Sequence, residues 1–348
     1  MSSPTLALQN AHMSYLAFSH QLDQWKSKVL GAICFSGLSM DENSVGITDV
    51  PVLQVLTPVL DGSDAACEVW LGNANLTQEQ CGAIRYRYDD EMLFGVIELP
   101  ETEQAPVDMP PLQQAAELAY RQILMLLDDL NYPFMYRFWN YMADINGVSH
   151  GLERYRQFNL GRQEAFLACG RGVEGDVPAA CALGTAHGPL TIAFLAGRTP
   201  SLAVENPRQI SAYQYPEQYG PRSPTFSRAS LLRLPQEEIL FISGTASIVG
   251  HETQHQADVI AQTRETLANL EAVIFEANRL ASKPEFNLAH VFFRVYVRYA
   301  ADMPLIREEM ERIIGATVKA VFLQADICRE DLLVEIEITA GHSFELIS

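Results

Sequence analysis

One order of secondary-structure elements can be read twice along this chain of 348 residues, and it constrains the fold more than any other feature. In the second half, alternating apolar residues predict strands, and apolar residues at helical spacing predict helices. The expected order is strand, helix, strand, helix, strand, strand, at residues 237–248, 257–278, 290–301, 302–315, 316–327 and 331–340. Such a unit forms one mixed sheet of about four to six strands with both helices on one face.

The first half repeats this plan in a weaker form. Segment 29–40 parallels strand 237–248, and segment 189–197 parallels strand 331–340. Between them we expect a helix, a strand and a second helix, at residues 112–130, 134–144 and 151–170. The repeat predicts a duplicated α+β fold, with an N-terminal domain at 1–200 and a C-terminal domain at 201–348. The long segment 199–226, rich in Pro, Tyr and Arg, is expected to be a functional loop.

Charge and composition exclude several classes of function. The net charge of −19 argues against binding to nucleic acid or to an anionic membrane. No apolar run is long enough to span a membrane, and the first residues show no basic region followed by an apolar stretch. The 6 cysteines form no CxxC pair, so we expect a cytoplasmic protein with free thiols, most of them buried.

Two acids interrupt the apolar strand 331–340. Because side chains alternate across a strand, Glu335 and Glu337 lie on the same face. The corresponding strand 189–197 has no acid, so the fold does not require them. Burial and a neighbouring carboxylate both raise a carboxyl pKa, so one acid could hold the other protonated as a proton donor. The alternative is that Glu337 lies at an edge and pairs with an arginine.

Several long motifs identify a resemblance to a known family. They are RFWNYMADING, GLERYRQFNLGR, GRTP, the segment 204–229, SGTASIVGHE and ADICREDLLVEIE, and they cover roughly residues 130–348. This part of the chain resembles the chorismatases, which have a duplicated YjgF/Rid-like (chorismate-mutase-like) fold. The resemblance implies chorismate as the small-molecule substrate and pyruvate plus a hydroxybenzoate, or a dihydroxylated cyclohexadiene carboxylate, as products. It implies no cofactor and no metal, and it leaves a monomer or a homotrimer open.

The resemblance also assigns roles to residues. Glu335 matches the family's catalytic glutamate, which would protonate the methylene carbon of the enolpyruvyl ether. Two substrate carboxylates require arginine and hydroxyl donors. The expected substrate-binding residues are Arg162, Tyr155, Tyr213, Tyr215, Arg222, Arg298, Cys328 and Gly244. Arg154, Arg156 and Arg294 are further candidates among the arginines. Because cations lower a carboxyl pKa, the arginines should hold the ends of the substrate away from Glu335.

Cys328 bears on the product. Chorismatases with alanine at this position hydrolyse chorismate to the diene, whereas those with cysteine form the aromatic acid. Cysteine therefore favours hydroxybenzoate as the product here: 3-hydroxybenzoate is expected, 4-hydroxybenzoate is left open as a second product, and the sequence does not settle their ratio. A bulkier and less wettable wall would exclude the hydrolytic water.

Other interpretations of the sequence remain. A Rid-type enamine or imine hydrolase and a non-catalytic protein that binds aromatic acids are both compatible with a YjgF-like fold. HETQH at 251–255 matches a zinc-protease motif, but we expect it in a loop, where the two histidines lose their helical spacing. GRGVEG at 170–175 lacks the flanking strand and helix that a dinucleotide loop requires.

Overall fold

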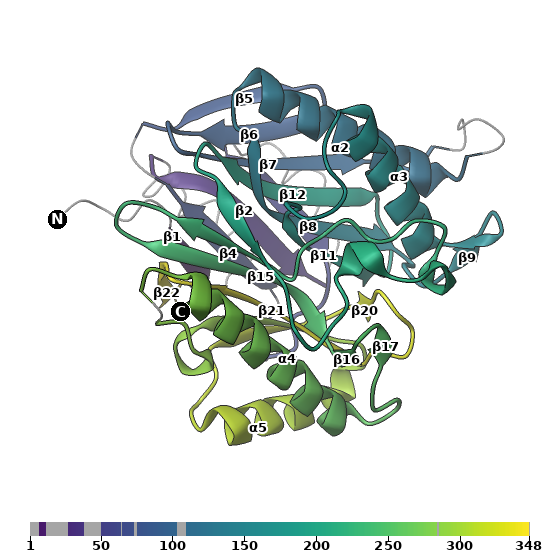
Figure 1. The fold of residues 1–348 in the computed structure, drawn as a ribbon, viewed down its shortest axis with the longest axis vertical. Helices are drawn as coiled ribbons and strands as arrows, with labels where there is room; N and C mark the ends of the chain where they lie inside the picture. Colours follow the sequence, from purple (N-terminus) through teal and green to yellow (C-terminus); the bar gives the residue numbers. More distant parts are fainter. Residues whose placement is uncertain are drawn as a thin grey trace.

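The structure is a computed structural model. It describes residues 7–11, 27–37, 50–63, 65–72, 75–102, 109–283 and 285–347. Two large mixed sheets form the centre of the molecule, and each carries a pair of helices on its outer face. Figure 1 shows α2 and α3 at one end of the molecule and α4 and α5 at the other, with the strands between them. The predicted α+β class with two related units is therefore confirmed.

The sheet of the second half has six strands in the order β13-β14-β15-β21-β18-β19. These are β13 (Ser201–Val204), β14 (Ala229–Arg233), β15 (Glu238–Ala246), β18 (Phe292–Val297), β19 (Ala320–Gln324) and β21 (Val334–Ala340). Helices α4 (Val259–Leu280) and α5 (Met303–Ile314) pack their apolar stripes on one face. Helix α4 begins where Asp258 accepts a hydrogen bond from the amide of Ala261, and α5 ends at the left-handed Gly315.

The sheet of the first half has seven strands in the order β20-β11-β8-β12-β7-β6-β5. These are β5 (Thr77–Cys81), β6 (Ile84–Tyr88), β7 (Met92–Leu99), β8 (Phe134–Ala143), β11 (Ala179–Thr185), β12 (Leu190–Gly197) and β20 (Asp326–Ile327). Helices α2 (Pro111–Asp129) and α3 (Arg154–Ala168) cover its outer face. The short strand β20 comes from the second half of the chain and joins the edge of this sheet, so the two halves are interlocked.

The two sheets have the same topology, and this corrects one predicted correspondence. Strand β12 lies between β8 and β7, as β21 lies between β18 and β15, and both are antiparallel to their neighbours. The counterpart of β15 is therefore β7. Segment 29–40 was the wrong choice, because its described part contains β2 (Val29–Ser36), which belongs to another sheet. The expected correspondence of β12 with β21 is confirmed. The division at residue 200 stays a prediction.

A third sheet of five strands, which the sequence did not predict, has the order β22-β1-β4-β2-β3. Its remaining strands are β1 (Ala7–Ala11), β3 (Val52–Leu56), β4 (Ala65–Leu71) and β22 (Ser343–Ile347). Cys34 and Cys67 lie directly opposite each other on β2 and β4, with Cα atoms 4.1 Å apart, and form a disulfide. The expectation of free thiols is wrong for this pair because a cross-strand partner is invisible in the sequence; Cys81, Cys169, Cys181 and Cys328 are free.

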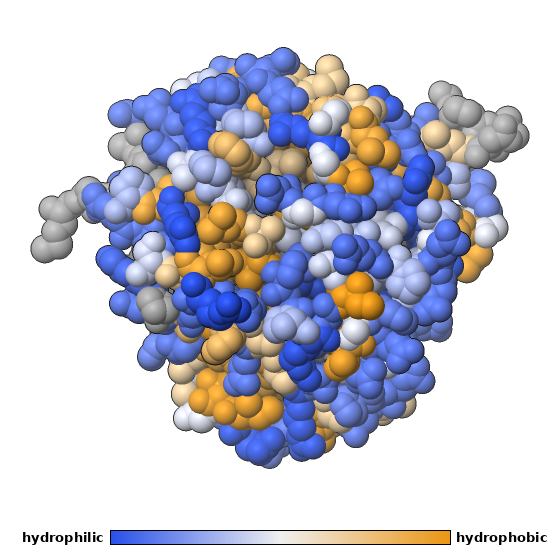
Figure 2. All heavy atoms as spheres, in the orientation of Figure 1, coloured by the Kyte–Doolittle hydropathy of each residue, from blue (hydrophilic) through white to orange (hydrophobic). Residues whose placement is uncertain are grey.

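The inner faces of all three sheets enclose one apolar core. Trp70, Trp139 and Phe241, one from each sheet, lie within ring-contact distance at its centre. On the outside, Figure 2 shows hydrophilic residues surrounding separate hydrophobic patches. No helix in the described ranges is long and apolar enough to cross a membrane. The core matters for function because charged side chains of β4, β8, β18 and β21 are buried within it.

Candidate functional site

A cavity of about 210 Å³ lies where the first half of the chain, the linker (segment 199–226) and the second half meet. Helix α3 contributes Tyr155, and the loop before β14 contributes Arg228. Strands β15 and β21 contribute Gly244 and Glu335. Segment 199–226 contains two short 3-10 helices, η2 (Ala212–Gln214) and η3 (Glu217–Tyr219), and contributes Tyr215 and Tyr219. The loop after β20 completes the wall with Cys328 and Arg329. Segment 199–226 is therefore part of the cavity wall.

Glu335 is the acid of this cavity. It lies on β21 between Ala246 of β15 and Tyr296 of β18, and only 3% of its surface is exposed. Burial raises its pKa to about 8, and the neighbouring Glu337 adds to the rise, while Arg137 opposes it. Among the described residues, no hydrogen bond or ion pair reaches its carboxyl group. Glu335 is therefore protonated at neutral pH and free to give its proton to a molecule in the cavity.

A backbone irregularity in β15 makes room for this carboxyl group. The pairing of β15 with β21 shifts register between Ile242 and Thr245, so Gly244 lies in the irregular segment. A Cβ atom on Gly244 would lie 1.9 Å from Oε1 of Glu335 and 3.2 Å from the Cβ of Cys181. The absence of a side chain at Gly244 therefore sets the position of the acid.

Glu337 lies two residues further along the same face and has the opposite electrostatic character. Its carboxylate lies 2.8 Å from Arg137 and 3.2 Å from Arg294, and it accepts a hydrogen bond of 3.2 Å from Trp139. Burial acts to raise the pKa of Glu337, but Arg137 and Arg294 outweigh burial and lower it. The alternative interpretation of Glu337 is correct about the arginine partners but wrong about the position, because β21 is a central strand and Glu337 is buried. The charge of Glu337 also adds to the effect of burial in raising the pKa of Glu335, as the first interpretation expected.

Two arginines that the sequence analysis did not single out line the cavity. Arg228 donates 2.8 Å hydrogen bonds to the Tyr215 hydroxyl and the Ile210 carbonyl, and Arg329 stacks 4.1 Å from the ring of Tyr219. The Nε of Arg228 and the Nη2 of Arg329 are buried with no hydrogen-bond partner within the described part of the chain. Each therefore has an N–H group available for an anion. Both lie within the family motifs, which was the only signal in the sequence.

Four of the expected substrate-binding residues lie outside the wall of this cavity. Arg162 is buried among aromatic rings, with its guanidinium 4.9 Å from the ring of Tyr120. Tyr213 is half-buried in η2, and Arg222 is an exposed side chain 3.4 Å from Glu164. The further candidate Arg154 pairs with Glu101, and Arg156 lines the cavity and pairs with Glu153.

Arg298 supports the loop that follows β20. Its guanidinium donates hydrogen bonds to the carbonyls of residues 327, 329 and 332, at distances of 2.7 to 3.0 Å. The same group forms a 2.8 Å ion pair with Asp326. These contacts fix the backbone that carries Cys328 and Arg329 and leads into β21.

Cys328 is a neutral wall residue. Burial raises the pKa of its thiol to about 12, and the nearby Glu335 adds to this effect. A thiolate nucleophile is therefore not available at neutral pH. Tyr155 likewise has a pKa raised by burial and stays protonated.

The HETQH segment lies in a hairpin of β16 (Ile248–Val249) and β17 (Glu252–Thr253), outside any helix, as expected. Nδ1 of His251 lies 3.2 Å from the Tyr219 hydroxyl, and the His251 carbonyl accepts from Arg329, so the segment borders the cavity. Within the described ranges, no cluster of three or more His, Cys, Asp or Glu side chains is placed to hold a metal ion.

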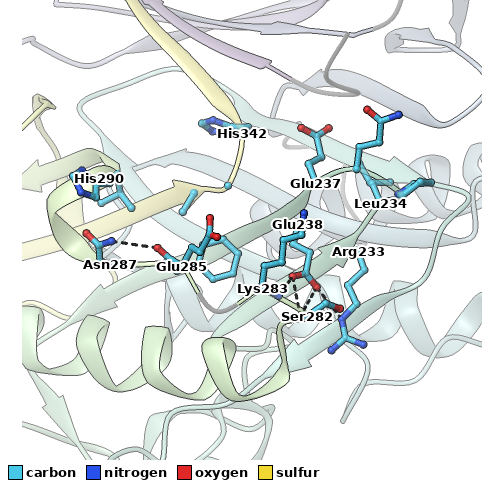
Figure 3. Close-up of a pocket in the computed structure, with 16 residues that line it drawn as sticks. Arg233, Leu234, Glu237, Glu238, Ser282, Lys283, Glu285, Asn287, His290 and His342 are labelled. Atoms are coloured by element: carbon cyan, nitrogen blue, oxygen red, sulfur yellow. Dashed lines mark hydrogen bonds and ion pairs between the residues drawn. The ribbon is translucent and has the colours of Figure 1, made fainter. Parts of the chain in front are cut away.

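A larger cavity of about 510 Å³ lies at the other end of β15 (Figure 3). Glu238 is fixed there by the amides of Ser282 and Lys283, and basic and acidic side chains alternate around the wall. None of the expected catalytic or substrate-binding residues lines it. We assign the functional site to the smaller cavity because it combines a protonated acid with two guanidinium groups that each keep an unused N–H donor.

Comparisons with known proteins show which family the chain resembles. Residues 68–196 match the family described as "Chorismatase FkbO/Hyg5-like, N-terminal". A 3-hydroxybenzoate synthase of Streptomyces hygroscopicus is 36% identical over 310 residues, which cover 85% of this chain and 89% of that protein. A chorismatase of the same organism is 36% identical over 311 residues, covering 86% and 88%. A crystal structure of a chorismatase superposes with a TM-score of 0.83 at 31% identity and covers 98% of this chain and 99% of its own.

Proposed function

The chain belongs to the chorismatase family, and from this premise we propose that it cleaves the enolpyruvyl ether of chorismate to give pyruvate and 3-hydroxybenzoate. The observation that carries the proposal is the buried, protonated Glu335 in a cavity with two guanidinium groups that have unused N–H donors. Chorismate is a dicarboxylate with an electron-rich vinyl carbon, so it needs one acid and at least two anion-binding groups.

The first step is transfer of the Glu335 proton to the terminal methylene carbon of the enolpyruvyl group. The methylene becomes a methyl group, and the positive charge is shared between the adjacent carbon and the ether oxygen. Glu335 becomes a carboxylate and stabilises this cation electrostatically. An ordinary glutamate is almost fully ionised at neutral pH, so a pKa of about 8 raises the fraction of proton-carrying enzyme by roughly two orders of magnitude.

The second step releases pyruvate and makes the ring aromatic. The neighbouring ring hydroxyl adds to the cationic carbon and loses its proton, so that carbon bridges the two ring oxygens. The bond from the ring to the former hydroxyl oxygen then breaks as the ether-bearing ring carbon loses its proton, which makes the ring aromatic and leaves the ether oxygen on it. The freed oxygen takes up a proton, and the resulting hemiketal separates into pyruvate and 3-hydroxybenzoate; direct loss of the ether oxygen by elimination would instead give 4-hydroxybenzoate.

Hydroxybenzoate and pyruvate together have the composition of chorismate, so this route consumes no water, whereas hydrolysis to the diene adds one. Cys328 lies in the wall beside Glu335, and its bulk supports the aromatic route because it reduces the space for water.

Arg228 and Arg329 are the proposed carboxylate-binding groups. Arginine offers a planar pair of donors that matches a carboxylate. Neither arginine is a cause of the Glu335 pKa shift, in which Arg137 is the opposing cation. They can therefore bind the ends of the substrate without drawing the proton from Glu335, which is the arrangement that the reaction requires.

The test is product analysis after incubation of the purified protein with chorismate in the presence of a chelator. We expect pyruvate and 3-hydroxybenzoate in equal amounts. Glu335→Gln should abolish turnover and keep the fold, whereas Glu271→Gln, which changes an exposed acid on α4, should leave turnover unchanged. Tight binding of hydroxybenzoate without turnover would support a binding protein instead, and turnover of an enamine with chorismate untouched would support a Rid-type hydrolase.

A further inference from the structure

Four charged side chains meet inside the central core. Glu68 of β4, Arg137 of β8, Arg294 of β18 and Glu337 of β21 come from all three sheets, and each is at most 4% exposed. Arg294 pairs with Glu68 and Glu337, and Arg137 pairs with Glu337. Two anions and two cations therefore balance each other within the cluster.

The stability of the fold does not account for this cluster. A buried ion pair is often no more stabilising than well-packed apolar residues, because desolvation offsets the attraction. In the first half of the chain, β12 (Leu190–Gly197) takes the same place in its sheet, is buried throughout and carries no charged side chain. The acids of β21 are therefore additional to what the architecture needs.

Glu335 is a third carboxyl group beside this balanced cluster. It lies about 7 Å along the strand from Glu337, on the same face. If Glu335 ionised, the buried set would hold three anions and two cations. Both cations of the cluster already have a carboxylate partner, because Arg294 is shared between two carboxylates and Arg137 pairs with Glu337. Arg137 still attracts Glu335, but burial and Glu337 outweigh this attraction.

We propose that Glu337 is a positioning residue: Arg137 and Arg294 hold it as a permanent carboxylate, and its charge keeps Glu335 in the proton-carrying form. The inference rests on the proposed function, because it assigns a role to Glu337 in loading the proton that Glu335 transfers. Glu337 itself does not line the cavity. It acts on the reaction only through Glu335.

Besides burial, the anion Glu337 raises the pKa of Glu335, and the groups that face Glu335 from other elements do not take this role. Cys181 of β11, Tyr155 of α3, Tyr296 of β18 and Cys328 are neutral, because burial raises the pKa of each. The charged residues of the cavity wall are Glu153, Arg156, Arg228, Arg329 and Glu330. Glu153 is paired with Arg156, and none of these five is a cause of the Glu335 shift.

Coulomb's law gives the expected shift of the Glu335 pKa when the charge of Glu337 is removed. A unit charge about 7 Å away in a medium with an effective dielectric constant of about 20 shifts a pKa by roughly 1 to 2 units. Glu337→Gln removes this charge and frees Arg137 to attract Glu335, so both changes lower the Glu335 pKa. The alkaline limb of the kcat/KM profile should move down by 1 to 2 pH units. At pH 7.5 this is a loss of about tenfold, and activity should recover at pH 5 to 6.

The experiment measures kcat/KM for chorismate from pH 5 to pH 10 in wild type, Glu337→Gln and Glu337→Asp. The aspartate variant keeps the charge, so its alkaline limb should stay within about half a unit of wild type even if its rate falls. A structural role would instead lower the rate of both variants without moving the limb. The double variant Arg294→Gln with Glu337→Gln removes one cation and one anion, so the net charge of the cluster is kept, and it should show the same downward shift if the single variant folds poorly.

The outcomes separate this inference from the proposed function. No turnover of chorismate by wild type, or full activity of Glu335→Gln, overturns the proposed function and this inference with it. In another outcome, the wild type turns over chorismate and depends on Glu335, but the alkaline limb does not move in Glu337→Gln or in the double variant. That result overturns only the role of Glu337. A wild-type kcat/KM profile whose alkaline limb has its midpoint below pH 6 also overturns the role of Glu337, because the pKa of Glu335 would then not be raised.

Discussion

Replacing Glu335 by Gln should stabilise the protein while it abolishes turnover, and the gain should depend on pH. The substitution keeps the size and hydrogen-bonding groups of the protonated carboxyl but removes the proton that can dissociate. Glu335 has a folded-state pKa of about 8 against an ordinary 4.5. Below pH 4.5 both states of the chain carry the proton, so the acid has no ionisation cost.

As the pH rises from 4.5 to about 8, the unfolded chain releases this proton while the folded protein retains it. The stability that Glu335 contributes is therefore fully present below the unfolded pKa and is lost as the pH rises to the folded pKa. Because one pKa unit corresponds to about 1.4 kcal/mol, the loss reaches roughly 4 to 5 kcal/mol at pH 8. Glutamine avoids this loss, so the variant should exceed wild type by a large part of that amount at pH 8.

The assay is urea unfolding followed by tryptophan fluorescence, since Trp70 and Trp139 are buried in the central core. Midpoints would be compared for wild type, Glu335→Gln and the surface control Glu271→Gln at pH 5, 6, 7 and 8. The Glu335→Gln advantage should be small at pH 5 and should grow with each step, while the control should track wild type. A constant difference, or a variant that is less stable at pH 8, would show that Glu335 is not held protonated by its surroundings.

Three further predictions concern the cavity wall and the loop that Arg298 supports. Arg228→Gln should lower kcat/KM for chorismate by about 10- to 100-fold, mainly through KM, because one charge-assisted carboxylate contact is lost; steady-state kinetics that show an unchanged KM would contradict this. Arg298→Lys should lower both kcat/KM, by about tenfold, and the unfolding midpoint, because the ammonium group of lysine cannot replace the hydrogen bonds that the guanidinium donates to three loop carbonyls, Asn146 and Asp326; kinetics and a melting curve check both, and wild-type values would rule out its loop-supporting role. Cys328→Ala should admit water beside Glu335 and raise the share of the dihydroxylated diene; an unchanged product ratio by chromatography would refute the wall argument.

The elements that the sequence predicted correctly are those with a strong local pattern. The helical spacing in 257–278 and the β-branched run in 290–301 depend on neighbouring residues, and both elements formed as expected. The match of segment 29–40 with strand 237–248 was wrong because small and apolar residues indicate that a strand is buried but not which sheet it joins. A buried strand has this composition in any sheet, so the sequence could not distinguish β2 from β7.

The site residues that could be predicted are those whose type is unusual for their place in a strand. Glu335 was found because an acid in an apolar strand is costly and demands a reason. Arg228 and Arg329 carry no such mark, since an arginine after a loop is usually solvated. Arg298 was expected at the substrate, but its guanidinium supports a loop, because a sequence does not show which backbone carbonyls fold back upon a side chain.

The meeting of three chain segments around one cavity limits how this enzyme could exchange parts with its relatives. Tyr155 comes from before residue 200, Tyr219 from the linker, and Arg329 and Glu335 from beyond it. A chimera joined near residue 200 would inherit each wall from a different parent, and β20 would have to pair with a foreign β11. A substitution that reshapes the wall in one half must therefore fit the residues that the other half contributes.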